Sequence, residues 1–146
     1  MKISTKGRYA LRFMIELAQN TSGMPMSLKD VALRQNISDK YLEQIISVLY
    51  KSGLVTSVRG MKGGYLLTKE PEEYTVGMIL RSTEGSLAPV ACVDKEVIDC
   101  ERLDGCATVV LWKKINDAIN DVVDHVTLKD LVDWQNRDCE RTEQLQ

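Results

Sequence analysis

Hydrophobic residues recur at helical spacing in two neighbouring stretches of the chain, and a serine precedes each stretch. Ser27 precedes the first and Ser38 the second. A serine before such a run is a preferred helix N-cap, because its hydroxyl accepts a hydrogen bond from a free backbone N–H group. The apolar positions are Leu28, Val31, Ala32 and Leu33, then Leu42, Ile45, Ile46 and Leu49. The pattern predicts two helices joined by a short turn, the second reaching about Lys51, which is a helix-turn-helix.

Two short runs of β-type residues follow, over residues 54–58 and 65–68. Gly53 fits the left-handed position that ends a helix, so the chain can turn directly into the first run. Between the runs lie three glycines and the cations Arg59 and Lys62. Glycines let the backbone approach a groove closely, and the two cations are placed to meet phosphates or a narrow minor groove. The sequence therefore predicts a hairpin wing.

The remainder of the chain is expected to be mainly α. A first helix ends near Asn20, another lies between Thr75 and Gly85, and the longest runs over residues 107–126. A short helix follows to about Trp134, and we expect the polar tail beyond it to be frayed. The predicted organisation is a winged helix-turn-helix DNA-binding domain over 1–85, a cysteine-bearing loop over 86–106, a dimerisation helix and return helix over 107–134, and a polar tail over 135–146.

The longest predicted helix carries an apolar stripe that is wide for so small a domain. Its positions are Val110, Leu111, Ile115, Ala118, Ile119, Val122 and Val126. A second copy of the same helix would cover this stripe, and helix-turn-helix proteins usually read palindromes as two-fold dimers. We therefore expect a homodimer. The alternative is that the helix packs only on the first helix of its own chain.

Charge divides the chain into a basic half and an acidic half. Residues 1–68 hold ten Lys or Arg and four acids, a net charge of +6, whereas the remaining residues hold nine and seventeen, a net charge of −8. The basic half is the half that carries the helix-turn-helix. Neutralising phosphates and releasing their counterions requires this distribution, so double-stranded DNA is the expected partner.

The expected DNA contacts lie in the N-terminal segment, at the start of the second helix of the helix-turn-helix and in the wing. Recognition helices present their N-terminal residues to base edges, and cations in the flanking segments bind phosphates. The candidate residues are Lys2, Ser4, Lys6, Arg8, Ser38, Lys40, Tyr41, Glu43, Gln44, Arg59 and Lys62.

Three of the four cysteines, Cys92, Cys100 and Cys106, lie within fifteen residues of one another in the predicted loop. Neither interval is the short knuckle of a zinc ribbon, and long intervals between soft thiolates suit an iron–sulfur cluster. The alternative is that they are unliganded thiols, which behave as small hydrophobes. Cys139 stands apart as an ordinary or redox-active thiol. His125, the only histidine, is expected to be structural, because a cation near a helix C-terminus is favourable without a metal.

Composition and motifs narrow the class of protein further. The 146 residues are 44% hydrophobic and 27% charged, which is typical of a globular domain, and no apolar run is long enough to span a bilayer. The charged N-terminal helix does not have the pattern of a signal peptide, so a cytoplasmic location is expected. No histidine stands beside an activated nucleophile, and the glycines of the wing do not form a phosphate loop. We therefore do not expect an enzyme.

Several of these motifs together resemble the Rrf-type winged-helix transcription regulators, above all the iron–sulfur cluster regulators of that family, with cysteine-metabolism and nitric-oxide regulators as relatives. The resemblance covers the chain to about Trp134. It is carried by residues 1–10, 37–38, 41–44, 53–60 and 63–65 and by the three loop cysteines. It implies a homodimer whose loop thiolates hold a cluster, with Tyr41, Glu43 and Gln44 facing the major groove and Arg59 in the minor groove.

One position departs from the family pattern. In the iron–sulfur regulators a histidine three residues after the third cysteine completes the cluster ligation, and here Val109 stands in its place. The identity of the fourth ligand is therefore undetermined. The candidates are a side chain of the partner's N-terminal helix, an exogenous thiol and the side chains of Asp94, Asp99, Glu101, Asp104 and Cys139. The cofactor expected is a [2Fe–2S] cluster, with [4Fe–4S] as the alternative.

Two functions fit these features of the sequence. The first is a regulator that senses iron–sulfur status through a loop-bound cluster and controls cluster assembly genes. The second is a regulator of cysteine metabolism that acts through a partner protein and needs no cluster. Lys40 adds a cation where relatives place a small polar residue, so the operator sequence cannot be transferred from them.

Overall fold

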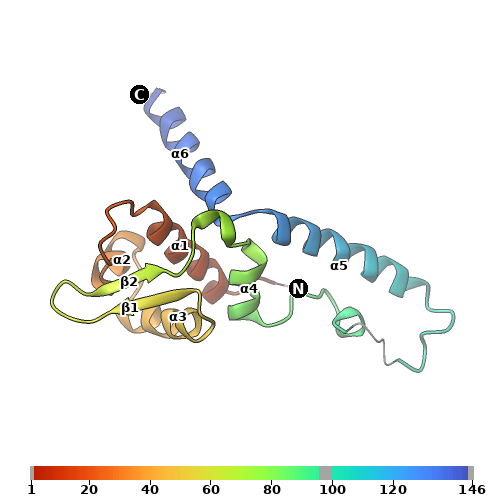
Figure 1. Cartoon of the computed structure of the whole chain (residues 1–146). Helices are drawn as coiled ribbons and strands as arrows, with labels where there is room; N and C mark the ends of the chain where they lie inside the picture. Colours follow the sequence, from red (N-terminus) through yellow and green to blue (C-terminus); the bar gives the residue numbers. More distant parts are fainter. Residues whose placement is uncertain (1, 96–99, 145–146) are drawn as a thin grey trace.

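A computed structural model describes residues 2–95 and 100–144, and Figure 1 shows it as a winged-helix body from which two helices extend. The body contains α1 (Thr5–Gln19), α2 (Leu28–Gln35), α3 (Asp39–Lys51), strands β1 (Val55–Val58) and β2 (Gly64–Leu67), the 3₁₀ turn η1 (Pro71–Glu73) and α4 (Val76–Glu84). A second 3₁₀ turn, η2 (Ala91–Val93), α5 (Ala107–His125) and α6 (Leu128–Gln144) follow. This order confirms the predicted mainly α winged helix-turn-helix with a two-stranded wing.

Four hydroxyl residues cap the starts of helices in the body, among them the two serines predicted to do so. Ser4, Ser27, Ser38 and Thr75 each accept a hydrogen bond from the backbone N–H three residues on, at 3.1–3.3 Å. The ends follow the predicted rules as well, since Gly53 and Gly85 have φ of +72° and +77° after α3 and α4. Local capping chemistry therefore fixes the length of each helix in the body.

The core lies where α1, α3 and α4 meet the base of the wing. Its largest fully buried side chains include Phe13, Met14, Leu42, Ile45, Leu49, Ile79 and Leu128. All four apolar positions predicted for the inner face of α3 are buried. The opposite face of α3 is therefore directed to solvent along the helix.

The wing is an antiparallel hairpin whose second strand also pairs with the segment before α2. Val55 lies opposite Leu67 and Val58 opposite Gly64. Tyr65 also exchanges two backbone hydrogen bonds with Met26, at 2.8 and 3.1 Å, so the segment before α2 extends the hairpin. A side chain at residue 64 would place its Cβ 2.2 Å from the Met26 carbonyl oxygen, so only glycine permits this approach.

Tyr74 joins the wing to α4. Its ring is fully buried, and its hydroxyl donates to the Leu54 carbonyl oxygen at 2.8 Å. The hydroxyl oxygen in turn accepts from the backbone N–H groups of Thr68 at 2.8 Å and Lys69 at 3.0 Å. Both ends of the hairpin are thus held by one side chain, so the wing has a fixed base.

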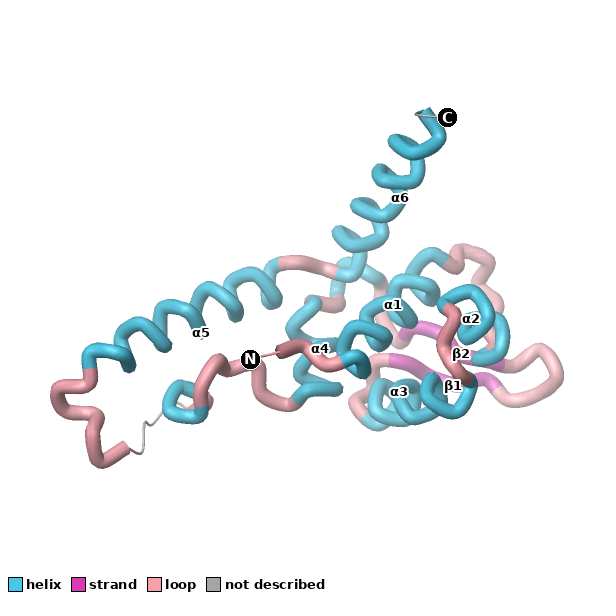
Figure 2. The backbone as a smooth tube through the Cα atoms, turned by 180° about the vertical axis from the view of Figure 1, so that it is seen from behind, coloured by secondary structure: helices cyan, strands magenta, loops and turns pink. Residues whose placement is uncertain are grey.

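Helix α5 runs outward from the body, as Figures 1 and 2 show from opposite sides. Only Val109 among its residues is buried, whereas Val110, Leu111 and Val122 are about half exposed. The alternative that α5 buries its stripe against α1 is wrong, because α5 packs on α4 and η2 instead. The apolar stripe therefore lies mostly uncovered in a single chain.

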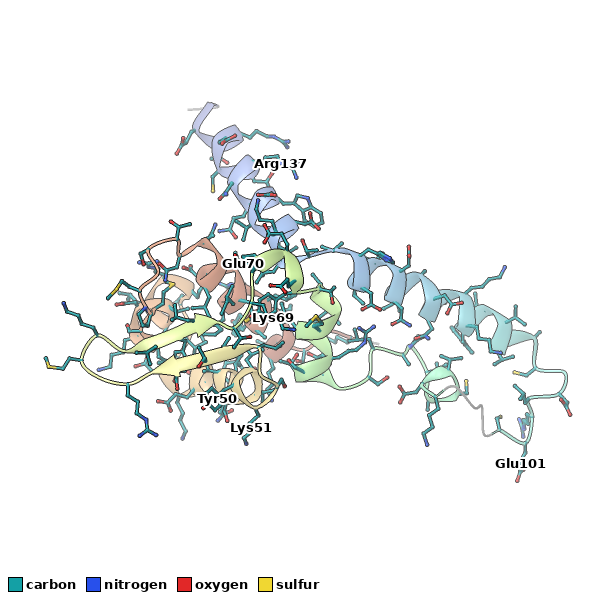
Figure 3. All side chains as sticks on the ribbon, viewed as in Figure 1. Tyr50, Lys51, Lys69, Glu70, Glu101 and Arg137 are labelled. Atoms are coloured by element: carbon teal, nitrogen blue, oxygen red, sulfur yellow. The ribbon has the colours of Figure 1, made fainter. Side chains whose placement is uncertain are left out.

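Helix α6 is longer than the sequence predicts. It continues to Gln144, so the prediction of a short helix to Trp134 and a frayed tail is wrong. Apolar periodicity ends at Trp134, but no glycine or proline follows, and the remaining residues have adequate helix propensity. The first turns pack through the buried Leu128 and Val132, while the part with Arg137 extends away from the body (Figure 3). No helix in the described part of the chain is long and apolar enough to cross a membrane.

Candidate nucleic-acid interface and cysteine segment

The start of α3 presents a polar, solvent-exposed row, as a recognition helix requires. Ser38, Lys40, Glu43 and Gln44 are exposed. Free backbone N–H groups would weaken this end of the helix, but the Ser38 hydroxyl accepts the Tyr41 N–H at 3.3 Å and keeps the first turn formed. The exposed side chains therefore stand on a rigid turn, which is the geometry that direct readout of bases needs.

Tyr41 differs from the other predicted contacts because its ring is half-buried. It packs edge-to-face on Tyr9 of α1, with ring centroids 5.9 Å apart. The guanidinium of Arg12 lies 5.1 Å from the centroid of the Tyr9 ring and donates to the Gln35 side-chain oxygen at 2.6 Å. Tyr41 therefore ties the start of α3 to α1, in addition to its predicted contact with DNA.

The wing tip is fully accessible. Arg59 and Lys62 are exposed, and Met61 between them projects entirely into solvent. Gly60 has φ of +117°, and its carbonyl accepts the Gly63 N–H at 3.0 Å, which makes the turn tight. The tip thus presents two cations on a narrow backbone loop, as predicted.

Residues 2–8, which we call the N-terminal arm, include the first turn of α1 and carry Lys2, Lys6 and Arg8. Lys2 and Arg8 are exposed and Lys6 is half-buried, whereas Ser4 is held within the chain. The Ser4 hydroxyl caps Gly7 and donates to Glu84 Oε1 at 2.5 Å. The hydroxyl proton is therefore used by Glu84, and a contact of Ser4 with DNA would rely on its remaining lone pair.

The cysteine segment, residues 86–106, connects α4 to α5. Cys92 lies in η2, where the neighbouring Val93 is buried against α5. Cys92 and Cys106 are half-buried, and Cys100 is exposed. Ser86 and Asp94 share a hydrogen bond between their side chains, which closes the first part of the segment. The segment is thus anchored at both ends beside α5.

Cys106 is the N-cap residue of α5. A hydrogen bond from Thr108 and the backbone N–H of Val109 lower the pKa of its thiol below the ordinary value. The positive end of the helix dipole favours the thiolate at such a position. Cys106 is therefore the cysteine best prepared to act as a nucleophile or a metal ligand.

The structure does not bring the three thiols together. Among the described residues, no three His, Cys, Asp or Glu side chains form a group that could hold a metal ion. Val109 is buried and has no donor atom. Of the suggested fourth ligands, Glu101 lies at the outer end of the segment, away from the winged helix (Figure 3), Cys139 lies on α6, and Asp99 falls outside the described residues. The predicted ligand set stays a prediction.

Two contacts, one joining α4 to α5 and one joining α4 to the N-terminal arm, were not predicted from the sequence. Arg81 of α4 binds Asp124 of α5 through both carboxylate oxygens, at 2.5 and 3.1 Å, and donates to Asn120 at 2.8 Å. The hydrogen bond from Arg81 lowers the pKa of Asp124. Glu84 of α4 holds the N-terminal arm. Both join residues far apart in the sequence, so no local pattern reveals them.

His125 lies in the last turn of α5, where its side chain contacts Asp121. Its Nδ1 lies 2.6 Å from the Asp121 carbonyl oxygen and 3.3 Å from that residue's carboxylate, in the last turn of α5. The ring is largely exposed and has no cysteine near it among the described contacts.

Comparisons with known proteins agree with this architecture. The family model Rrf2, an iron-dependent transcriptional regulator, matches residues 3–134. The chain is 46% identical to the transcriptional regulator CymR of Bacillus subtilis over 140 residues, 96% of each chain. It is 40% identical to the regulator IscR of Pectobacterium atrosepticum over 151 residues, 97% of this chain and 91% of that one.

A solved structure of CymR, the global cysteine regulator of B. subtilis, superposes with a TM-score of 0.78 at 46% identity, covering 92% of this chain and 98% of that one. Both kinds of relative are transcription regulators, which confirms the expected class. The chain therefore belongs to the Rrf2 family of DNA-binding transcriptional regulators.

Proposed function

We propose that the chain acts as a homodimer that binds a palindromic operator and senses iron–sulfur status through Cys92, Cys100 and Cys106, controlling genes of cluster assembly. The observation that carries this proposal is the position of Cys106. Cys106 is the N-cap residue of α5, at the helix end where the cysteine segment joins, and the pKa of its thiol is lowered. Ligation there acts directly on the helix that carries the uncovered apolar stripe.

The donor set suits an iron–sulfur cluster in its chemistry. Three soft thiols are available on one segment, and the segment is poor in other groups that would compete for soft metals. The thiols must converge for a cluster to form, so binding would reorder the segment between η2 and α5. A carboxylate or a group from the partner would complete the set, since Val109 cannot.

The chain's own residues transmit this change to the DNA-binding half. Val93 seats the segment against α5, and Arg81 clamps α5 to α4 through Asp124. When bound, a cluster would supply a redox-active centre whose stability depends on its ligands and exposure. A tenfold change in operator affinity needs only about 1.4 kcal/mol of differential binding between cluster-bound and cluster-free states.

Cysteine substitutions test this proposal. Protein reconstituted anaerobically with iron and sulfide is expected to be coloured, and Ala at Cys92, Cys100 or Cys106 to abolish the cluster absorbance with the circular dichroism of the helices retained. Cys139→Ala is the matched control, because Cys139 is an exposed thiol on α6, and it is expected to keep most of the absorbance. Wild-type protein that stays colourless, or that binds zinc tightly through four sulfurs, would contradict the proposal.

The cluster-free alternative has its own support. The chain is 46% identical to CymR and 40% identical to IscR, and the fourth-ligand position carries the buried Val109. In that case the chain regulates cysteine metabolism through a partner protein, and the thiols are unliganded. Iron and sulfide assays on anaerobically purified protein separate the two functions, because only the first predicts stoichiometric iron.

The homodimer rests on α5. Val110, Leu111 and Val122 expose apolar surface on a helix that runs free of the body, and a second copy would bury it. Val122→Lys places a charge in the proposed interface and is expected to give a monomer in light scattering. Asp117→Lys changes charge by the same sign at an exposed polar position of α5 and is the control.

A further inference from the structure

The N-terminal arm begins α1 with an electrostatic conflict. Lys6 and Arg8 stand in the first turn, and no acidic residue does. The N-terminus of a helix carries a partial positive charge, so cations there are unfavourable. A helix that must present cations to phosphates at this end needs a compensating negative charge from elsewhere in the fold.

Glu84 supplies that charge from the last turn of α4. Its Oε1 accepts from the Ser4 backbone N–H at 3.2 Å and from the Ser4 hydroxyl at 2.5 Å. A Cβ at residue 7 would lie 2.3 Å from the same oxygen, so Gly7 leaves the space that the carboxylate fills. Glu84 thus acts as a second cap on α1, although it lies eighty residues from Ser4 in the sequence.

Glu84 lies between the cysteine segment and the start of α1, which contacts the recognition helix. Gly85 and the cysteine segment follow it directly, and Arg81, one turn earlier, clamps α5. On the other side, the start of α1 reaches the recognition helix through the contact of Tyr9 with Tyr41. Figures 1 and 2 both show the start of α1 beside the end of α4, where the cysteine segment leaves the body.

We infer that Glu84 is a positioning residue for DNA binding: its carboxylate holds the N-terminal arm so that Lys2, Lys6 and Arg8 reach phosphates, and it couples that arm to the cysteine segment. This inference rests on the proposed phosphate contacts of the arm. It predicts that loss of an acidic residue weakens DNA binding. Simple electrostatics predicts the opposite, because removing a negative charge strengthens attraction to DNA.

The test measures operator affinity against salt by fluorescence anisotropy. We expect Glu84→Ala to bind about tenfold more weakly at physiological salt, with a salt slope that is shallower by about 0.9 for each phosphate that the arm no longer neutralises. Glu84→Gln keeps an acceptor oxygen for Ser4 but loses the negative charge, so it is expected to bind between Glu84→Ala and the wild type. Asp117→Ala, which removes an exposed acid from α5, is the control and is expected to leave the slope unchanged.

A second variant keeps the inference testable if Glu84→Ala folds poorly. Gly7→Ala displaces the Glu84 carboxylate from the other side, while alanine favours the helix over glycine. We therefore expect weaker binding and a shallower slope with no loss of melting temperature. A general loss of folding would lower the melting temperature without this change of slope.

The possible results distinguish a failure of this inference from a failure of the proposed phosphate contacts of the arm. If the triple substitution Lys2→Ala, Lys6→Ala, Arg8→Ala leaves the slope unchanged, the arm makes no phosphate contacts, and the inference is overturned with them. If that variant flattens the slope but Glu84→Ala and Gly7→Ala bind like the wild type, the arm's role stands and the inference alone is wrong.

Discussion

Replacing Tyr74 by phenylalanine removes one oxygen atom from the point where the wing meets the body. The ring is fully buried, so its packing is retained. The hydroxyl donates to Leu54 and accepts from the N–H groups of Thr68 and Lys69, which uses its one proton and two lone pairs. The Thr68 hydroxyl also lies 3.1 Å away, but it donates its own proton to the Gly53 carbonyl oxygen. The variant therefore isolates the contribution of three hydrogen bonds.

The magnitude follows from the surroundings of each partner. Leu54 is buried, so its carbonyl oxygen loses its partner with little access to water, at a cost of about 1–2 kcal/mol. Thr68 and Lys69 are exposed residues whose N–H groups can reach water, and the loss of each bond costs about 0.5 kcal/mol. We expect the free energy of unfolding to fall by about 2–3 kcal/mol in total, which lowers the melting temperature by about 5–10 °C.

Urea unfolding followed by circular dichroism measures this loss, and an unchanged m-value shows that the same surface unfolds. Tyr50→Phe is the matched control, because Tyr50 is an exposed tyrosine on α3 (Figure 3). It is expected to change stability by less than about 0.5 kcal/mol. A Tyr74→Phe variant as stable as this control would refute the role of the hydroxyl as the anchor of the wing.

Three further outcomes are expected. Arg59→Ala should weaken operator binding strongly and reduce its salt dependence, and a neutral result in a salt titration would contradict the wing contact. Glu43→Ala should broaden the bound sites in a randomised-site selection, because an ionised carboxylate accepts from cytosine and repels phosphate; an unchanged profile would count against it. Asp124, whose pKa Arg81 lowers, contributes stability above its ordinary pKa and loses it as the pH falls through the lowered value. The difference in melting temperature between wild type and Asp124→Asn should therefore shrink in acid, and it should be small throughout, since this pair is partly exposed.

Local chemistry in the sequence was sufficient to predict the winged helix. Ser4, Ser27, Ser38 and Thr75 begin helices because a hydroxyl can satisfy a free N–H group whatever the rest of the fold does. The buried face of α3 follows from periodicity in the same way. These features depend on residues within one helical turn of each other, so one sequence contains all the information.

Features that depend on distant residues were not predictable. Glu84 contacts Ser4, and Arg81 contacts Asp124, through pairings that only the tertiary fold creates. The extension of α6 past Trp134 was missed for a different reason, because a polar helix lacks the apolar period used to recognise it. The candidate DNA contacts were accessible to sequence reasoning because a recognition helix is marked by its exposed polar end.

Ionisation of the Cys106 thiol and formation of the first turn of α5 are thermodynamically linked. The helix start that lowers the pKa of the thiol is in turn stabilised by the thiolate, and this stabilisation is lost as the pH falls through the lowered pKa. A reaction that removes the negative charge of the thiolate, such as its protonation, therefore removes this stabilisation from the first turn of the helix. The protection of the Val109 amide hydrogen, which is bonded to the Cys106 carbonyl oxygen at 3.3 Å, against exchange with solvent is therefore expected to follow the chemical state of this sulfur.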